Sequence, residues 1–221
     1  RYVGMPGGDM AIREPWRMAL AHLVDANESD ALLANRIAPA ALRTVRQMLE
    51  RRFNSPMTSS AGRLFDAVAA SAGVRDRVTF EGQAAMELEW LAGETVNDNC
   101  YPWEIAEKPE FPWVIDTRPL IRAVADDVRR GQPSLMIARR FHATMAEMIG
   151  TVCDRIGQTT GLGAVVLSGG VFMNALLMHE SFARLESKGF KVYRHRKVPP
   201  NDGGLSLGQL AIAAASGQRS K

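Results

Sequence analysis

Two adjacent glycines occur late in the chain, in the sequence Ser168-Gly169-Gly170-Val171, between a short apolar stretch and an amphipathic one. Because glycine has no Cβ atom, backbone N–H groups in such a turn can approach an anion closely, and the start of a following helix favours negative charge. Asn174 follows the turn and can hydrogen-bond a phosphate or a sugar hydroxyl. The segment is neither a P-loop nor a Gly-x-Gly-x-x-Gly fingerprint. It is therefore either a nucleotide-binding turn or a packing turn.

A second Gly-flanked segment reads Asn201-Asp202-Gly203-Gly204. A carboxylate on such a loop, directly after a predicted strand, is a common ligand of a hard cation or of water. One carboxylate cannot hold a metal ion alone. The alternative is an Asx turn, in which the side chains satisfy the loop's own backbone.

Asp66 lies inside an otherwise apolar helical pattern that begins at Gly62. A carboxylate near a buried stripe is costly unless it has a partner. The partner is either Arg63, three residues earlier, or a polar ligand that the carboxylate faces. The turn Glu81-Gly82-Gln83 offers a similar choice between a helix cap and a ligand-binding loop.

The histidines and cysteines do not form a recognisable site. The spacings HxxH, HxxxH, HExxH and CxxC are absent, and no Gly-x-Ser-x-Gly elbow occurs. No histidine lies near Ser168 in the sequence, so Ser168 is expected to contact phosphate rather than to act as a nucleophile. The residues concerned are His22, His142, His179, His195, Cys100 and Cys153.

The spacing of apolar residues predicts that residues 1–160 are mostly helical. Pro15 suits a first helical turn, and the run 54–60 should break one helix before the next begins. Asp116 or Thr117 is expected to cap a helix. The expected helices are Glu14–Asp25, Leu32–Ile37, Ala41–Phe53, one carrying Leu64 to Ala69, Ala84–Leu91, one that finishes over Arg122–Arg130, and Leu135–Ile156; the expected strands are Tyr101–Ile105 and Phe111–Ile115.

Residues 161–221 follow a different pattern. A strand over Ala164–Leu167, a helix over Asn174–Lys188 and a strand over Phe190–His195 make a βαβ unit. A further helix is expected over Leu205–Ala215, and its small residues would allow it to pack closely on a sheet. The pattern therefore predicts an α/β or α+β protein, with a helical region at 1–160 and a sheet region at 161–221.

Composition excludes several classes of protein. The 221 residues are 46% apolar and 23% charged, with a net charge of +3, which fits one large or two small globular domains. Basic residues form short clusters without interleaved aromatics, so no nucleic-acid partner is expected. No apolar run approaches the roughly 18 residues of a membrane span. With two cysteines and no signal peptide, a cytoplasmic location is expected.

Five segments in register resemble the C-terminal part of the hydrogenase-maturation carbamoyltransferases of the HypF family. Any one of them is a modest signal, but their order over nearly the whole chain is specific. They are Pro6-Gly7-Gly8-Asp9 with Ala11-Ile12-Arg13-Glu14-Pro15-Trp16-Arg17-Met18-Ala19, then Thr58–Ala69, Phe80–Ala85, Ser168–Asn174 and Val198–Gln209.

The resemblance implies an actin/Hsp70-like (ASKHA, ribonuclease-H-like) nucleotide-binding fold. In this family carbamoyl phosphate and ATP give a carbamoyl-adenylate, whose carbamoyl group passes to the C-terminal cysteine of the partner HypE. The attacking thiolate comes from the partner, so no catalytic residue is assigned in this chain. The resemblance places Ser168, Gly169, Gly170 and Asn174 on the nucleotide-binding turn, Gly62 and Asp66 on an adenosine-side helix, Glu81 and Gly82 on the adjoining turn, and Asp202 on a metal-ligand aspartate.

The chain departs from the family pattern in one respect. The family's metal site, for Mg, Fe or Zn, also uses two histidines from an upstream His-rich motif that is absent here. The chain, which begins with Arg1, is therefore expected to be the last part of a multidomain enzyme. Two alternative functions remain: an O-carbamoyltransferase acting on a small hydroxylated metabolite, and a non-catalytic nucleotide-binding domain of the same fold.

Overall fold

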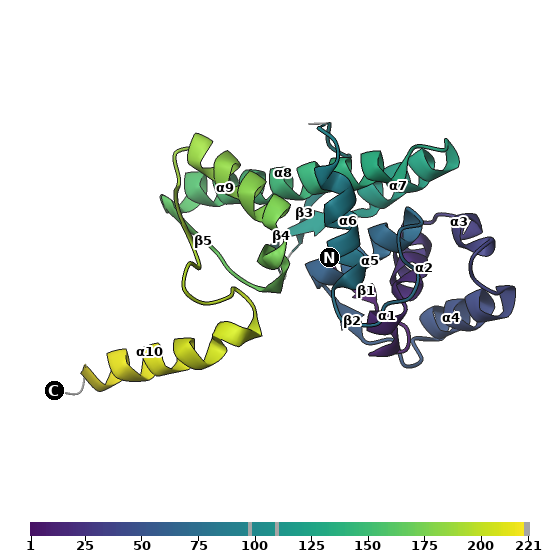
Figure 1. Cartoon of the computed structure of the whole chain (residues 1–221), viewed down its shortest axis with the longest axis horizontal. Coiled ribbons are helices and arrows are strands. Elements are labelled where there is room, and N and C mark those ends of the chain that lie inside the picture. The colour runs from purple at the N-terminus through teal and green to yellow at the C-terminus, as the bar shows by residue number, and fades with distance from the viewer. Residues whose placement is uncertain (97–98, 109–110, 219–221) are drawn as a thin grey trace. The chain divides into compact units, whose positions relative to one another are not determined.

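The computed structural model describes residues 1–96, 99–108 and 111–218 (Figure 1). The chain divides into two compact units, Arg1–Thr144 and Met145–Lys221. The division falls inside helix α8 (Ser134–Thr160), whereas the sequence pattern changes only after that helix. Each unit is described by itself below.

The first unit is mostly helical, as predicted. Helices α2 and α5 form its centre, where Trp16, Leu20 and Phe65 are almost fully buried. Pro15 occupies the first turn of α2, a position where its missing N–H is not needed. The helices of this unit are α1 (Met10–Arg13), α2 (Pro15–Asp25), α3 (Ala31–Ala34), α4 (Pro39–Arg51), α5 (Ala61–Ser71), α6 (Gln83–Gly93), α7 (Arg118–Arg129) and the first part of α8.

One predicted helix is shorter than expected, and one predicted strand begins later in the chain. Helix α3 ends at Ala34 instead of Ile37, and Ala38, which precedes Pro39, takes the extended conformation that proline imposes on its neighbour. The first predicted strand begins at Glu104, not at Tyr101. Tyr101 is buried and tied to helices instead, because its N–H donates to the Thr144 hydroxyl and its own hydroxyl donates to Asp127.

Two small antiparallel pairings complete the first unit. Strands β3 (Glu104–Lys108) and β4 (Phe111–Asp116) form a hairpin. Strands β1 (Val3–Gly4) and β2 (Met57–Thr58) were not predicted, because two-residue strands carry no periodicity. The Asp116 carboxylate accepts a hydrogen bond from the Arg118 N–H at 2.9 Å, so it helps to begin α7.

The second unit contains the predicted βαβ element. Strands β5 (Ala164–Leu167) and β6 (Lys191–Arg194) are parallel and are joined through the helix α9 (Ala175–Ser187). Leu167, Leu177 and Leu185 are buried. The remaining elements are the short 3₁₀ helices η1 (Gly170–Met173) and η2 (Asp202–Gly204) and the helix α10 (Leu205–Gln218).

The packing of the last helix on a sheet, which its small residues would allow, does not occur among the described residues. The side chains of α10 are exposed as far as residue 216, including Leu210 at 68% and Ile212 at 69%. The sheet of the second unit, as described, has only β5 and β6, and two strands offer little surface for a helix to cover.

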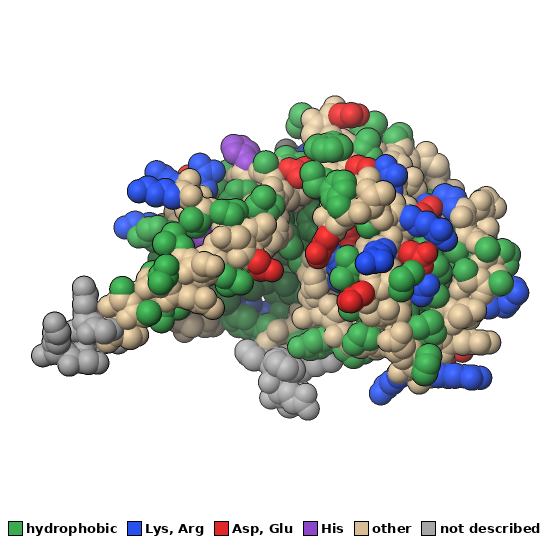
Figure 2. Space-filling view, turned by 60° about the horizontal axis from the view of Figure 1, so that its bottom comes forward, with side chains coloured by type: hydrophobic (Ala, Val, Ile, Leu, Met, Phe, Trp, Pro, Cys, Tyr) green, Lys and Arg blue, Asp and Glu red, His purple; other side chains and the backbone are tan. Residues whose placement is uncertain are grey.

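The surface carries both signs of charge. On the face drawn in Figure 2, Lys and Arg side chains are interspersed with Asp, Glu and apolar side chains. Within the described ranges, no helix combines the length and the apolar character needed to cross a membrane.

Candidate functional site

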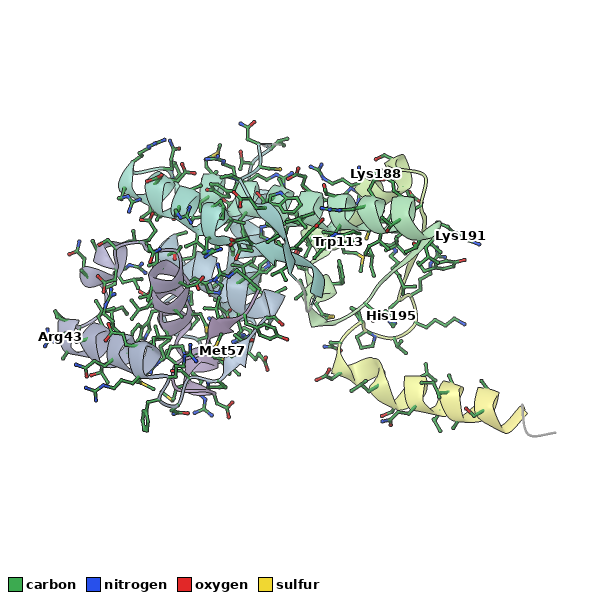
Figure 3. All side chains as sticks on the ribbon, turned by 180° about the vertical axis from the view of Figure 1, so that it is seen from behind. Arg43, Met57, Trp113, Lys188, Lys191 and His195 are labelled. Carbon is green, nitrogen blue, oxygen red and sulfur yellow. The ribbon has the colours of Figure 1, made fainter. Side chains whose placement is uncertain are left out.

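Ser168 and His195 meet at the carboxyl edge of the β5–β6 sheet. In the parallel register Leu167 lies opposite Arg194, so Ser168 and His195 are the next residues along the two strands. The Ser168 Oγ and the His195 Nε2 are 2.9 Å apart, and both side chains are exposed. Figure 3 shows His195 on the segment between β6 and α10.

This contact corrects the expectation that no histidine lies within reach of Ser168. Sequence distance was the wrong criterion, because the two residues are 27 positions apart and the βαβ crossover brings them together. The signal was present in the sequence: each residue lies at the end of a predicted strand of one parallel pair. Ligands of open α/β sheets bind at that edge.

The two glycines that follow Ser168 serve different purposes. Gly169 has a φ of 102° and a ψ of 159°, a conformation that is essentially restricted to glycine. Its N–H donates to the Pro200 carbonyl at 2.8 Å and so is not available to a phosphate. A Cβ on Gly170 would meet only the Asn201 Cβ, at 4.0 Å, which is ordinary contact. The N–H groups of Gly170 and Val171 are therefore the better candidates for anion contact.

The loop that packs on Gly169 is closely constrained. The Asn201 Oδ1 accepts a hydrogen bond from the Gly203 N–H at 3.1 Å, which is the Asx turn that the sequence offered as an alternative to a cation-binding loop. A Cβ on Gly204 would lie 2.8 Å from the Pro199 carbonyl oxygen, so this position requires glycine. Asp202 is exposed beside these residues.

A metal site is not present among the residues that the structure describes. They contain no cluster of three or more His, Cys, Asp or Glu side chains able to hold an ion. Asp202 therefore offers a single carboxylate, and these residues do not fit a metal by themselves.

Asn174 has a structural role that can coexist with ligand binding. Its Oδ1 accepts a hydrogen bond from the Leu177 N–H at 2.7 Å and caps helix α9. The two donors of the side-chain amide are on Nδ2, a different atom from the capping oxygen. The cap therefore does not preclude a hydrogen bond from Asn174 to an anion.

In the first unit, Arg63 links Asp66 and Glu81. An Arg63 nitrogen lies 2.7 Å from the Asp66 carboxylate, which is the first of the two partners that the sequence allowed. A second Arg63 nitrogen lies 3.7 Å from Glu81, whose side chain is 75% exposed. Asp66 is only 2% exposed, so Arg63 connects a buried carboxylate to one at the surface.

The Arg63–Asp66 pair is not fully satisfied. Its atoms are close, yet the Arg63 Nη1 and the Asp66 Oδ2 are buried without a hydrogen bond of acceptable geometry. Burial raises the pKa of Asp66 to about 6, which the charge of Arg63 opposes and the charge of Glu81 reinforces. The unused hydrogen-bonding capacity of this carboxylate is therefore buried, and only the Glu81 end of the Arg63 link lies at the surface.

The two glycines of this region leave space around their Cα atoms. A Cβ on Gly62 would meet only the Ser60 hydroxyl, at 3.6 Å, and one on Gly82 would meet nothing within 4 Å. Gly82 has a φ of 82° and precedes α6, so its conformation favours glycine. Gly62, Asp66, Glu81 and Gly82 belong to the first unit, and Ser168, Gly169, Gly170, Asn174 and Asp202 belong to the second.

The parallel strands and their connecting helix are typical of an α/β protein. The Gly-Gly turn lies at the carboxyl edge of these strands, where such proteins bind ligands, and is a candidate anion site. Comparison with known families agrees: residues 1–209 match the model described as the carbamoyltransferase, Kae1-like domain, second subdomain. The chain belongs to this family.

Individual relatives of this chain are named as HypF carbamoyltransferases. The chain is 39% identical to the carbamoyltransferase HypF homolog of Cupriavidus necator over 95% of its own length and 55% of that protein. It is 40% identical to the carbamoyltransferase HypF of Rhodobacter capsulatus over 95% of its length and 26% of that protein. A crystal structure of full-length HypF in the phosphate- and nucleotide-bound form matches with a TM-score of 0.88 and 38% identity, over 96% of this chain and 28% of that one. The chain thus spans between about a quarter and about half of these relatives.

Proposed function

We propose that this chain is the part of a HypF-like carbamoyltransferase that holds the nucleotide during carbamoyl transfer, within an actin/Hsp70-like fold. The observation that carries the proposal is the Ser168-Gly169-Gly170 turn at the carboxyl edge of β5 and β6. Membership of the carbamoyltransferase family and the nucleotide-bound relative support it.

The proposed reaction converts carbamoyl phosphate, water and ATP into a carbamoyl-adenylate, inorganic phosphate and pyrophosphate. The thiolate of a HypE-like acceptor's C-terminal cysteine then attacks the carbamoyl carbon. A C–S bond forms, the bond from that carbon to the phosphate oxygen breaks, and AMP leaves with the electron pair. The reducing cytoplasm suits this step, because it keeps the acceptor cysteine as a thiol.

Within this chain, the proposed roles are binding and orientation. The N–H groups of Gly170 and Val171 and the hydroxyl of Ser168 donate to phosphate oxygens, with Asn174 beside them. Such fixed donors stabilise the charge that develops on the leaving phosphate.

The adenosine side is assigned to the first unit. The space beside Gly62 and Gly82 and the exposed carboxylate of Glu81 support this assignment, and the buried Asp66 is proposed to act through Arg63. Asp202 is proposed to contribute one carboxylate to a metal bound mainly by other residues, and no step of the reaction is assigned to that metal.

The proposal is tested by exchanging this chain for the corresponding segment of a relative. The quarter of the Rhodobacter capsulatus enzyme that corresponds to this chain is replaced by the chain, and the intact mass of a HypE acceptor is measured after incubation with ATP and carbamoyl phosphate. We expect carbamoylation of the acceptor, and its loss when the exchanged segment carries Gly169→Val. Cooperative melting of both hybrids shows that they are folded.

Other outcomes of this experiment contradict the proposal. A folded hybrid that carbamoylates a small alcohol but not the acceptor identifies an O-carbamoyltransferase. A folded hybrid that binds ATP and transfers nothing identifies a nucleotide-binding domain without activity.

A further inference from the structure

We propose that His195 is a positioning residue that orients the Ser168 hydroxyl towards a phosphate group of the bound nucleotide. The inference rests on the proposed function and adds to it a residue that lies outside the Gly-Gly turn. It starts from the 2.9 Å separation between the His195 Nε2 and the Ser168 Oγ, both at the exposed edge of the sheet.

The direction of this hydrogen bond decides what Ser168 can do. A serine hydroxyl has one proton and two lone pairs, and a neutral imidazole nitrogen either donates or accepts. If the His195 Nε2 accepts, the serine proton is used within the protein. If the Nε2–H donates to the Oγ, the serine proton points outward. A phosphate oxygen only accepts, so the bound state requires the second arrangement: Nε2–H to Oγ, and O–H to phosphate.

The surrounding backbone holds both partners in place. The pairing of Leu167 with Arg194 fixes the residue before each of them. On the other side, the Gly169 N–H is bonded to the Pro200 carbonyl at 2.8 Å, which ties the segment after Ser168 to the segment after His195. An imidazole fixed in this way restricts the rotation of the serine hydroxyl before the ligand arrives, which reduces the entropy lost on binding.

The local charge is also favourable to a phosphate. His195 lies within the sequence Arg194-His195-Arg196-Lys197, all of which is exposed. Arg194 packs its guanidinium over the Phe182 ring at 5.4 Å. Positive charge on this segment raises the local concentration of anionic ligands without fixing their position. Position therefore has to come from the directed Ser168 and backbone donors.

The test is a double-mutant cycle measured by isothermal titration of the hybrid enzyme described above with ATP and, separately, with adenosine. We expect His195→Ala to weaken ATP binding about tenfold, the effect of one hydrogen bond to a charged group. We expect adenosine binding to be unchanged, because adenosine has no phosphate. His195→Gln, whose side-chain amide can still donate, should restore most of the ATP affinity. His179→Ala, which removes an exposed histidine from α9, is the matched control and should have no effect.

The double-mutant cycle shows whether His195 acts on the ligand through Ser168 or contacts the ligand itself. If His195 acts through Ser168, adding His195→Ala to Ser168→Ala changes ATP affinity less than twofold. Additive losses overturn the inference, because they show that the imidazole contacts the ligand independently. Unchanged ATP affinity in His195→Ala also overturns it and leaves the proposed function intact. If the folded hybrid without further substitutions binds neither ATP nor adenosine, the proposed function fails and the inference fails with it.

Discussion

The buried carboxylate of Asp66 should make the stability of the first unit depend on pH in an unusual direction. Burial raises its pKa from 3.8 to about 6, so the folded state holds the proton more tightly than the unfolded state. Between these two values the folded state binds more protons, and the free energy of unfolding therefore falls as pH rises. Most carboxylates in ion pairs behave in the opposite way.

The magnitude follows from the size of the shift. A change of about two pKa units at about 1.4 kcal/mol per unit gives about 3 kcal/mol between pH 4 and pH 7. His142 acts in the opposite direction over part of this range. Its burial lowers its pKa to about 4, against a hydrogen bond to the Ala138 carbonyl, so its contribution is lost as pH falls. The wild-type curve alone therefore does not isolate Asp66.

A difference measurement removes the contribution of His142. Urea unfolding of the wild type and of Asp66→Asn is followed from pH 4 to pH 7 by tryptophan fluorescence, because all four tryptophans lie in the first unit. The variant should gain about 3 kcal/mol relative to the wild type across this range. Asp126→Asn is the control: the pKa of this exposed carboxyl is lowered by its hydrogen bond with Arg129, so any trend should have the opposite sign. A flat difference for Asp66→Asn would refute the reasoning.

Three further predictions concern the second unit, where unfolding is followed by far-UV circular dichroism. Asn174→Ala should lower the free energy of unfolding by about 1 kcal/mol, because the helix cap is lost. Asn174→Asp should keep the cap and weaken ATP binding by charge repulsion. An ATP affinity equal to that of the wild type in Asn174→Asp would remove this residue from the site. Gly169→Ala should cost about 1–3 kcal/mol because of its backbone conformation, and Gly170→Ala clearly less; equal losses would contradict the structure. Asp202→Asn should leave the urea midpoint unchanged, whereas Asn201→Ala should lower it, because Asn201 makes the turn.

The elements that could be predicted are those with long periodic patterns or clear breakers. Strand β5 and helices α2 and α9 have nearly the predicted bounds, because apolar spacing and Gly or Pro signals agree there. Tyr101 was misplaced because its apolar character fits a strand equally well, and only tertiary hydrogen bonds to Thr144 and Asp127 decide its position.

The candidate site could be predicted only in part, because local sequence signals do not determine contacts between distant segments. The Gly-Gly turn is a local signal in the sequence, and Gly169 adopts a backbone conformation that requires glycine. The contact with His195 depends on strand register, and the contact of Gly169 with Pro200 depends on how a later loop folds back. The number of residues between the partners predicts neither contact, although the predicted strand ends already place Ser168 and His195 at one edge of the sheet. Helical spacing permits Asp66 to pair with Arg63 without requiring it, so the pair is established only by the structure.

The parallel pairing of β5 and β6 makes the length of the intervening segment as important as the identity of the residues at its ends. Side chains alternate between the two faces of a strand, so a shift of β6 by one residue turns His195 away from Ser168 and presents a neighbouring arginine instead. A single insertion or deletion between β5 and β6 can cause that shift without changing any residue of the site. Homologues that differ in length here should be aligned by strand register before their site residues are compared.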